Sequence, residues 1–186
     1  MREGKLIVIS GASGVGKGTV LGLMMEKRKD LSFSVSATTR DPRPGEVDGK
    51  HYFFISKECF EEMIANNEFL EYDAHAANYY GTLRGQAEAK MKKGHVLLDI
   101  EPKGAAQVRK AAPDATLIFI MPPSKAELER RLRGRGDTPE DQIAMRMERA
   151  AWEMEQRSWY DYVVVNDDAQ RCADEILNII SKLEEQ

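Results

Sequence analysis

The stretch Leu6-Ile7-Val8-Ile9-Ser10-Gly11-Ala12-Ser13-Gly14-Val15-Gly16-Lys17-Gly18-Thr19 decides the fold. Its apolar start predicts a buried strand, and the glycine-rich segment that follows leads into a helical pattern. Glycines allow successive backbone N–H groups to turn inward around an anion, and a lysine adds positive charge for the β- and γ-phosphates. We therefore predict a phosphate-binding loop that holds a nucleoside triphosphate. A glycine-rich surface turn is the alternative.

The expected triphosphate contacts come from one continuous segment of the chain, which consists of Gly11, Ala12, Ser13, Gly14, Val15, Gly16, Lys17, Gly18 and Thr19. The strict motif places Ser or Thr directly after the lysine, where its hydroxyl binds Mg²⁺. Here Gly18 occupies that position, and Thr19 supplies the first hydroxyl. We expect Mg²⁺ to be held by the phosphates and water, with Thr19 as the candidate protein ligand.

Composition limits the classes of function. A chain of 186 residues predicts one domain, or one core with insertions. The 31 acidic residues exceed the 27 basic ones, which does not favour nucleic acid as a partner. Cys59 and Cys172 lack metal-ligand spacing and are expected in the core. Without a signal-like start or a membrane-length apolar run, we expect a soluble, cytoplasmic protein with no membrane partner.

Strand-like and helix-like patterns alternate along most of the chain. Buried apolar strands separated by helices predict an α/β fold with a parallel sheet flanked by helices. The stretch 33–82 differs, because it holds short β-rich pieces and one helix that Ser56 caps. We therefore expect a core made of residues 1–32 and 83–186, and a small inserted α+β unit with an antiparallel sheet at 33–82. The other expected strands are 96–100, 117–120 and 162–165. The other expected helices cover 104–112, start at Ser124 and Thr138, or follow the last strand with Cys172 to Leu183 on their inner face.

A second cluster lies in the inserted stretch. Arg40 and Arg43 are three residues apart in a loop that prolines stiffen. The planar guanidinium fork suits phosphate oxygens, and a rigid loop loses less entropy on binding. Tyr52 and Tyr80 can add hydroxyl donors to the same anion. This cluster predicts a second phosphate site and hence a second nucleotide, against the alternative of a solvated surface.

Five motifs together resemble guanylate kinase, and the resemblance covers essentially the whole chain. They are the glycine loop, Ser36 to Glu46, Asn78 to Thr82, Arg131 to Gly136, and Val165 to Asp168, in that family's order. The resemblance implies a P-loop NTPase-type core with a five-stranded parallel sheet, a GMP-binding unit and a short helical lid at about 126–148. It also implies transfer of a phosphoryl group from ATP to GMP, and to dGMP, with Mg²⁺ on the triphosphate.

The resemblance also implies residue roles. Arg131, Arg135 and Arg146 match arginines around the transferred phosphoryl group, and with Lys17 they are the expected catalytic residues. Asn166 matches a residue near the adenine. The expected GMP contacts are Arg40, Arg43, Tyr52 and Tyr80 for the phosphate, and Ser36, Glu71 and Thr82 for the guanine, with Asp99 and Glu101 nearby.

Chemistry independently supports these roles. The acceptor phosphate is already ionised at neutral pH, so the transfer requires positioning and charge neutralisation rather than a dedicated base. His51, His75 and His95 accordingly form no triad or metal pattern. A carboxylate at Glu71 accepts from both N1–H and the 2-amino group of guanine, whereas adenine offers neither donor. The alternative for Glu71 is a solvated charge on a strand edge.

The chain departs from the family pattern at three places. Gly18 follows the loop lysine as in adenylate kinases, Glu101-Pro102-Lys103 replaces the Asp-x-Gln of the family's Asp-x-Asp-x-Gln-Gly, and Ala37 is a small change beside Ser36. Two alternative functions stay open. A guanylate-kinase-like peptide-binding module is one alternative function, although such modules typically lose the phosphate loop. A kinase that acts on another phosphate acceptor is the second. The oligomeric state is open.

Overall fold

The computed structural model describes residues 4–75, 77–134 and 139–185. Its central sheet has five strands in the order β2-β7-β1-β8-β9, and the pairs β2–β7 and β8–β9 are parallel. Every residue of β1 is buried, as expected for a strand that helices cover on both faces. The α/β prediction is therefore confirmed. The strands are β1 Leu6–Gly11, β2 Leu31–Phe33, β7 His95–Asp99, β8 Thr116–Met121 and β9 Tyr162–Val165.

The chain divides into two compact units. The first unit contains Met1–Val8 and Asp30–Thr116, and the second contains Ile9–Lys29 and Leu117–Gln186. Strand β1 therefore contributes residues to both units. The expected division into a core and an inserted unit at 33–82 stays a prediction.

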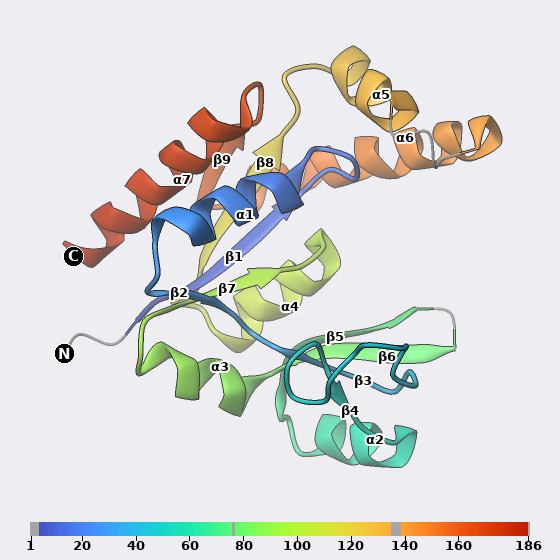
Figure 1. Ribbon diagram of the computed structural model, residues 1–186, viewed down its shortest axis with the longest axis vertical. Coiled ribbons are helices and arrows are strands. Elements are labelled where there is room, and N and C mark those ends of the chain that lie inside the picture. Colours follow the sequence, from blue (N-terminus) through green and yellow to red (C-terminus); the bar gives the residue numbers. More distant parts are fainter. Residues whose placement is uncertain (1–3, 76, 135–138, 186) are drawn as a thin grey trace. The chain divides into compact units, whose positions relative to one another are not determined.

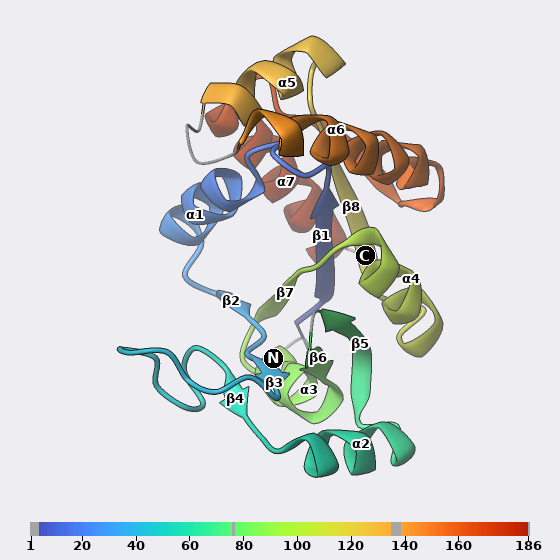
Figure 2. The same cartoon turned by 90° about the vertical axis from the view of Figure 1, so that its right-hand side faces the viewer.

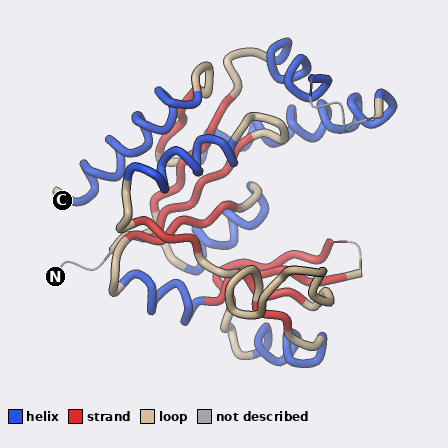
Figure 3. Tube along the Cα trace, in the orientation of Figure 1, coloured by secondary structure: helices blue, strands red, loops and turns tan. Residues whose placement is uncertain are grey.

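A second sheet belongs to the first unit and has the order β4-β3-β6-β5 (Figures 1 and 3). Strand β6 pairs antiparallel with β3 and with β5, but β4 runs parallel to β3. The expectation of an antiparallel sheet is thus wrong for β4, because the long segment between β3 and β4 returns the chain in the same direction. The strands are β3 Ser36–Thr38, β4 Phe53–Phe54, β5 Phe69–His75 and β6 Asn78–Leu83.

Helix α2, Lys57–Ala65, covers this sheet. The Ser56 hydroxyl accepts from the Cys59 amide at 3.1 Å, which confirms the predicted cap. Phe60 is fully buried and stacks on Phe69 with 4.3 Å between ring centroids. Cys59 is exposed, so its expected place in the core is wrong. One residue before Phe60, it lies about 100° around the helix from the buried side chain.

Two further helices belong to the first unit, one after β6 and one after β7. Helix α3, Arg84–Met91, was not predicted, and α4, Pro102–Ala111, begins two residues before the expected Gly104. Helix α4 lies beside β5 (Figure 2). Gln107 of α4 holds the main chain of this strand: its side chain accepts from the Tyr72 amide at 3.1 Å and donates to the Tyr72 carbonyl at 2.8 Å.

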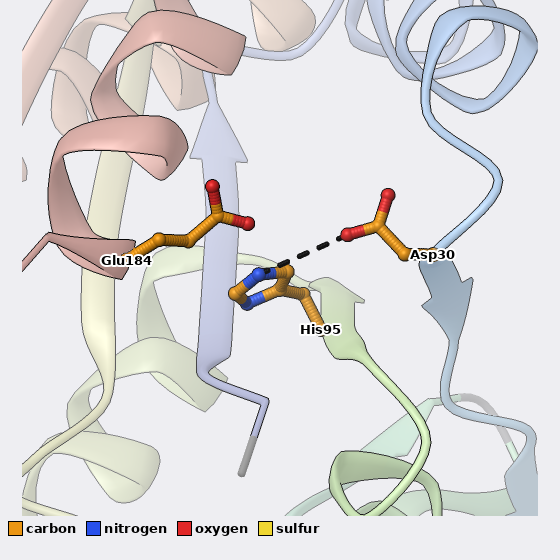
Figure 4. Close-up of side chains that lie close together, drawn as sticks. All are labelled: Asp30, His95 and Glu184. Atoms are coloured by element: carbon orange, nitrogen blue, oxygen red, sulfur yellow. Dashed lines mark ion pairs between the residues drawn. The ribbon is translucent and has the colours of Figure 1, made fainter. Parts of the chain in front are cut away.

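His95 has a structural role at the start of β7. It is buried, and its Nδ1 accepts from the Lys5 amide at 3.0 Å. Its Nε2 lies 3.9 Å from a carboxylate oxygen of Asp30, the residue before β2 (Figure 4). These contacts tie the ends of neighbouring segments together.

The second unit carries helices on β1, β8 and β9. Helices α1 and α7 lie side by side (Figure 1), and Arg28 donates to Glu184 at 2.6 Å. The Ser124 hydroxyl accepts from the Glu127 amide at 3.1 Å before α5, which confirms the predicted start of this helix, and the Glu127 side chain accepts from Arg130 and Arg131. Thr138, the predicted cap of the next helix, is outside the described residues. None of the described helices could cross a membrane. The helices are α1 Lys17–Lys27, α5 Lys125–Gly134, α6 Glu140–Glu155 and α7 Ala169–Glu184, with a 3-10 turn at Gln156–Trp159.

Candidate functional site

The predicted phosphate loop connects β1 to α1 in the second unit. Gly14 and Gly16 have φ angles of 84° and 92°, which a residue with a Cβ adopts only with strain. The Asn166 side chain donates to the Val15 carbonyl at 2.8 Å and holds the outer turn of the loop. The sequence thus builds a strand–loop–helix unit whose bend depends on its glycines.

Lys17, Gly18 and Thr19 form the first turn of α1. Nothing lies within 4 Å of the position that a Cβ at Gly18 would occupy, and its backbone is not among the positive-φ glycines. Thr19 is exposed and supplies the hydroxyl of this turn. Hydroxyl oxygen is a suitable ligand for Mg²⁺, which takes one or two protein oxygens and completes its shell with phosphates and water. The residues present fit that ion.

Arg131 lies on α5 and contacts the main chain of the loop. It donates to the carbonyls of Val15 at 3.1 Å and Asn166 at 3.0 Å, and Glu127 accepts from its Nε at 2.8 Å. The two arginines at positions 130 and 131 lower the pKa of the Glu127 carboxyl to about 2, so this ion pair persists at neutral pH. Arg131 therefore joins the loop to the segment after β9.

The other predicted arginines of the transfer site are placed only in part. Arg146 lies on α6 in the second unit and is partly buried. Arg135 lies outside the described residues, as do the other residues of 135–138 in the expected lid at 126–148. The described parts of that lid are most of α5 and the first half of α6.

The first unit contains a cavity of about 400 Å³. Glu71 of β5 lines it with only 8% of its surface exposed, so the alternative of a solvated strand-edge charge is not what the structure shows. The Thr82 hydroxyl donates to its carboxylate at 2.6 Å. Burial raises the pKa of Glu71, and the bond from Thr82 opposes that shift. Ser36 lines the same cavity and pairs with Thr82 across β3 and β6.

The far side of this cavity comes from the end of β7 and the start of α4. Asp99, Glu101 and Lys103 line it, and Gly104 closes it. A Cβ on Gly104 would lie 2.9 Å from an oxygen of Glu71. Glycine therefore lets the helix approach the carboxylate closely, and a side chain at this position would require Glu71 to shift.

The predicted phosphate-binding arginines lie in the loop after β3. Both terminal nitrogens of Arg40 donate to Glu46 at 2.9 Å, and this carboxylate raises the pKa of Arg40, with Tyr80 adding to the effect. The guanidinium lies over the Tyr52 ring, and the Tyr52 and Tyr80 rings are in contact. Arg43 is exposed, and its amide donates to Glu46. The structure therefore brings Arg40 and both tyrosines together.

Sequence reasoning missed three residues at these places. Gly104 touches Glu71, Gln107 fixes the strand that carries it, and Glu153 accepts a hydrogen bond from the phosphate loop. Gly104 could have been found from the glycine that ends the Asp-x-Asp-x-Gln-Gly pattern. Gln107 and Glu153 carry no comparable local signal.

Known proteins resemble this chain over most of its length. A family model described as guanylate kinase matches residues 3–183. The guanylate kinase of Trichodesmium erythraeum is 49% identical over 168 residues, which cover 90% of each chain. A guanylate kinase of Thermus thermophilus is 46% identical over 180 residues, 96% of this chain and 81% of the relative. A guanylate kinase crystal structure from Anaplasma phagocytophilum has a TM-score of 0.73 at 34% identity and covers 99% of this chain and 88% of that one.

Proposed function

Because this chain belongs to the guanylate kinase family, we propose that it transfers the γ-phosphoryl group of ATP to GMP through the two sites described above. The chain is an ATP:GMP phosphotransferase, and dGMP is a second acceptor. The observation that carries this assignment is the presence, in one chain, of a glycine phosphate loop and a cavity with a buried carboxylate.

The donor site is the loop from Gly11 to Thr19. Its inward amides and Lys17 bind the triphosphate, and the N-terminus of α1 adds favourable electrostatics for an anion. Mg²⁺ supplies charge neutralisation when bound, and Thr19 is the residue that would hold it. Asn166 lies behind the loop at the proposed adenine end.

The acceptor site is the cavity around Glu71. Its carboxylate accepts from N1–H and the 2-amino group of guanine, with Ser36 and Thr82 beside it. A base that lacked those donors would leave the buried carboxylate with the Thr82 bond but without the two bonds from guanine, which is a strong basis for discrimination. Arg40, Arg43, Tyr52 and Tyr80 hold the acceptor phosphate. To bind the phosphate, Arg40 must replace at least one of its two hydrogen bonds to Glu46 with a bond to a phosphate oxygen.

Transfer then depends on position and charge. The acceptor phosphate is already an anion and needs no base, so arginines and Lys17 stabilise the negative charge that develops on the transferred group. We assign this role to Arg131, Arg135 and Arg146 with Lys17. Closure of the lid would exclude water and prevent hydrolysis of ATP.

The remaining proposals concern the binding partners of the protein and its location in the cell. Its partners are the small molecules ATP and GMP, without nucleic acid or membrane, and it acts in the cytoplasm. A peptide-binding module has less support, because this chain retains Gly14, Gly16 and Lys17.

A coupled assay of ADP release tests the acceptor. We expect turnover with GMP and dGMP and little with AMP, UMP or CMP; equal rates with AMP would refute the role of Glu71. Lys17→Ala tests the donor site. It should remain folded and lose at least about 100-fold in turnover, since removal of one preorganised charge partner has that effect in comparable sites. Near-normal turnover in a folded variant would remove the phosphate-loop assignment.

A further inference from the structure

We propose that Glu153 is a positioning residue that holds the phosphate loop in its binding shape before ATP arrives. The inference rests on the proposed donor site and deepens it. Glu153 lies on α6, 140 residues along the chain from its loop partner, Ser13.

Each oxygen of this carboxylate has its own partner. Oε2 accepts from the Ser13 amide at 2.7 Å, and Oε1 accepts from Nε of Arg149 at 3.1 Å. The Glu153 side chain is 3% exposed, whereas that of Arg149 is 49% exposed. The carboxylate is therefore enclosed between the loop and its own helix.

The buried carboxylate of Glu153 lies beside the proposed triphosphate site, where a negative charge is unfavourable in two ways. Burial of a carboxylate is costly unless it is paired and hydrogen-bonded, and a charge of the same sign as the triphosphate opposes ATP binding. Arg149 offsets that charge. The Ser13 bond supplies the compensating gain, because an anion acceptor makes a strong hydrogen bond with a main-chain amide.

That gain is preorganisation of the loop. Ser13 lies between Gly11 and Gly14, and a glycine-rich segment has the largest backbone entropy to lose on ordering. A loop already ordered by Glu153, by Asn166 and by Arg131 loses less on binding, so a given set of phosphate contacts gives tighter binding.

The first test is nucleotide binding without turnover, measured with a fluorescent ADP analogue. Glu153→Ala should weaken this binding about tenfold, the loss of one charge-assisted hydrogen bond. Glu153→Gln keeps an oxygen that can accept from Ser13 and should recover most of the affinity. Glu148→Ala, an exposed change on the same helix, is the matched control and should bind as wild type.

Steady-state kinetics separate positioning from a general structural defect. The KM for ATP should rise in Glu153→Ala while the KM for GMP stays within about twofold, since the proposed GMP residues lie in the other unit. An equal rise in both, or unchanged analogue binding, would overturn the proposal. Because binding is read without GMP, a failure of the acceptor assignment would not affect this result.

Amide hydrogen exchange keeps the proposal testable if the alanine variant does not fold. The Ser13 amide should be protected in the nucleotide-free wild type and in Glu153→Gln. Rapid exchange of that amide in the wild type would refute a loop held in shape before binding.

Discussion

Gly104→Ala should selectively damage the acceptor site. An alanine Cβ would lie 2.9 Å from Oε2 of Glu71 and 3.4 Å from its Cδ, whereas ordinary contacts begin near 3.4 Å. The carboxylate must therefore move by about half an ångström, away from a position fixed by the 2.6 Å bond from Thr82. Hydrogen bonds to a charged group contribute about 1.5–3 kcal/mol, so we expect the KM for GMP to rise about 10- to 100-fold.

The same substitution should not weaken the helix. Alanine has a higher helix propensity than glycine by about 0.8–1.0 kcal/mol, so α4 itself gains stability. Loss of GMP affinity in a protein that is at least as stable as wild type would therefore reflect the clash. Gly85→Ala in α3 is the matched control, because nothing lies within 4 Å of its Cβ position.

The measurement is steady-state turnover with GMP and with ATP varied in turn, beside thermal unfolding of both variants. We expect the KM for ATP to stay unchanged in Gly104→Ala. A KM for GMP equal to that of the wild type would show that the Glu71 carboxylate can shift away from the new Cβ without loss of GMP binding. It would refute the position that we assign to the carboxylate in GMP recognition.

Three further predictions address other parts of the two sites. Arg43→Ala should raise the KM for GMP about tenfold or more and leave that for ATP unchanged, as lost phosphate contacts predict; equal damage to both would contradict separate sites. Gly18→Ser should allow full turnover at lower Mg²⁺, since its Cβ position is open, and an unchanged Mg²⁺ titration in an active variant would show that the missing hydroxyl is immaterial. Glu71→Gln should stabilise the ligand-free protein increasingly as pH rises above the ordinary carboxyl range: burial raises the pKa of Glu71, so folding with the ionised form becomes less favourable there. Denaturant unfolding of both proteins from about pH 4 to 8 checks this. A difference in free energy of unfolding between Glu71→Gln and wild type that decreases with rising pH would contradict the prediction.

The buried strands could be predicted because their pattern is unambiguous. The runs at 6–9, 117–120 and 162–165 are apolar with little interruption, and they became β1, β8 and β9. The phosphate loop could also be predicted, because this spacing of glycines and a lysine between a strand and a helix is typical of few other structures.

The strands of the second sheet were harder to predict from the sequence, because their patterns are irregular or short. Strand β5 runs Phe-Leu-Glu-Tyr-Asp-Ala-His, and its pairing with β6 shifts between Phe69 and Glu71. The irregularity breaks the alternation that identifies a half-buried strand, so Phe69, Leu70 and Glu71 are all buried in succession. Strand β4 has two residues, too few for any periodicity.

Arg131 shows that a sequence motif can identify a candidate site residue without predicting the groups that this residue contacts in the folded protein. The resemblance assigns it to the transferred phosphoryl group, yet in the structure it donates to Val15, Asn166 and Glu127. These arrangements are compatible, because a guanidinium has five N–H donors and these three bonds use one donor each of Nε, Nη1 and Nη2. In the proposed role, the remaining donor on each terminal nitrogen would bind a phosphate oxygen while the other keeps its carbonyl. Arg131 would then hold the loop and bind the phosphoryl group at once, a combination that the single ammonium of a lysine would not reproduce.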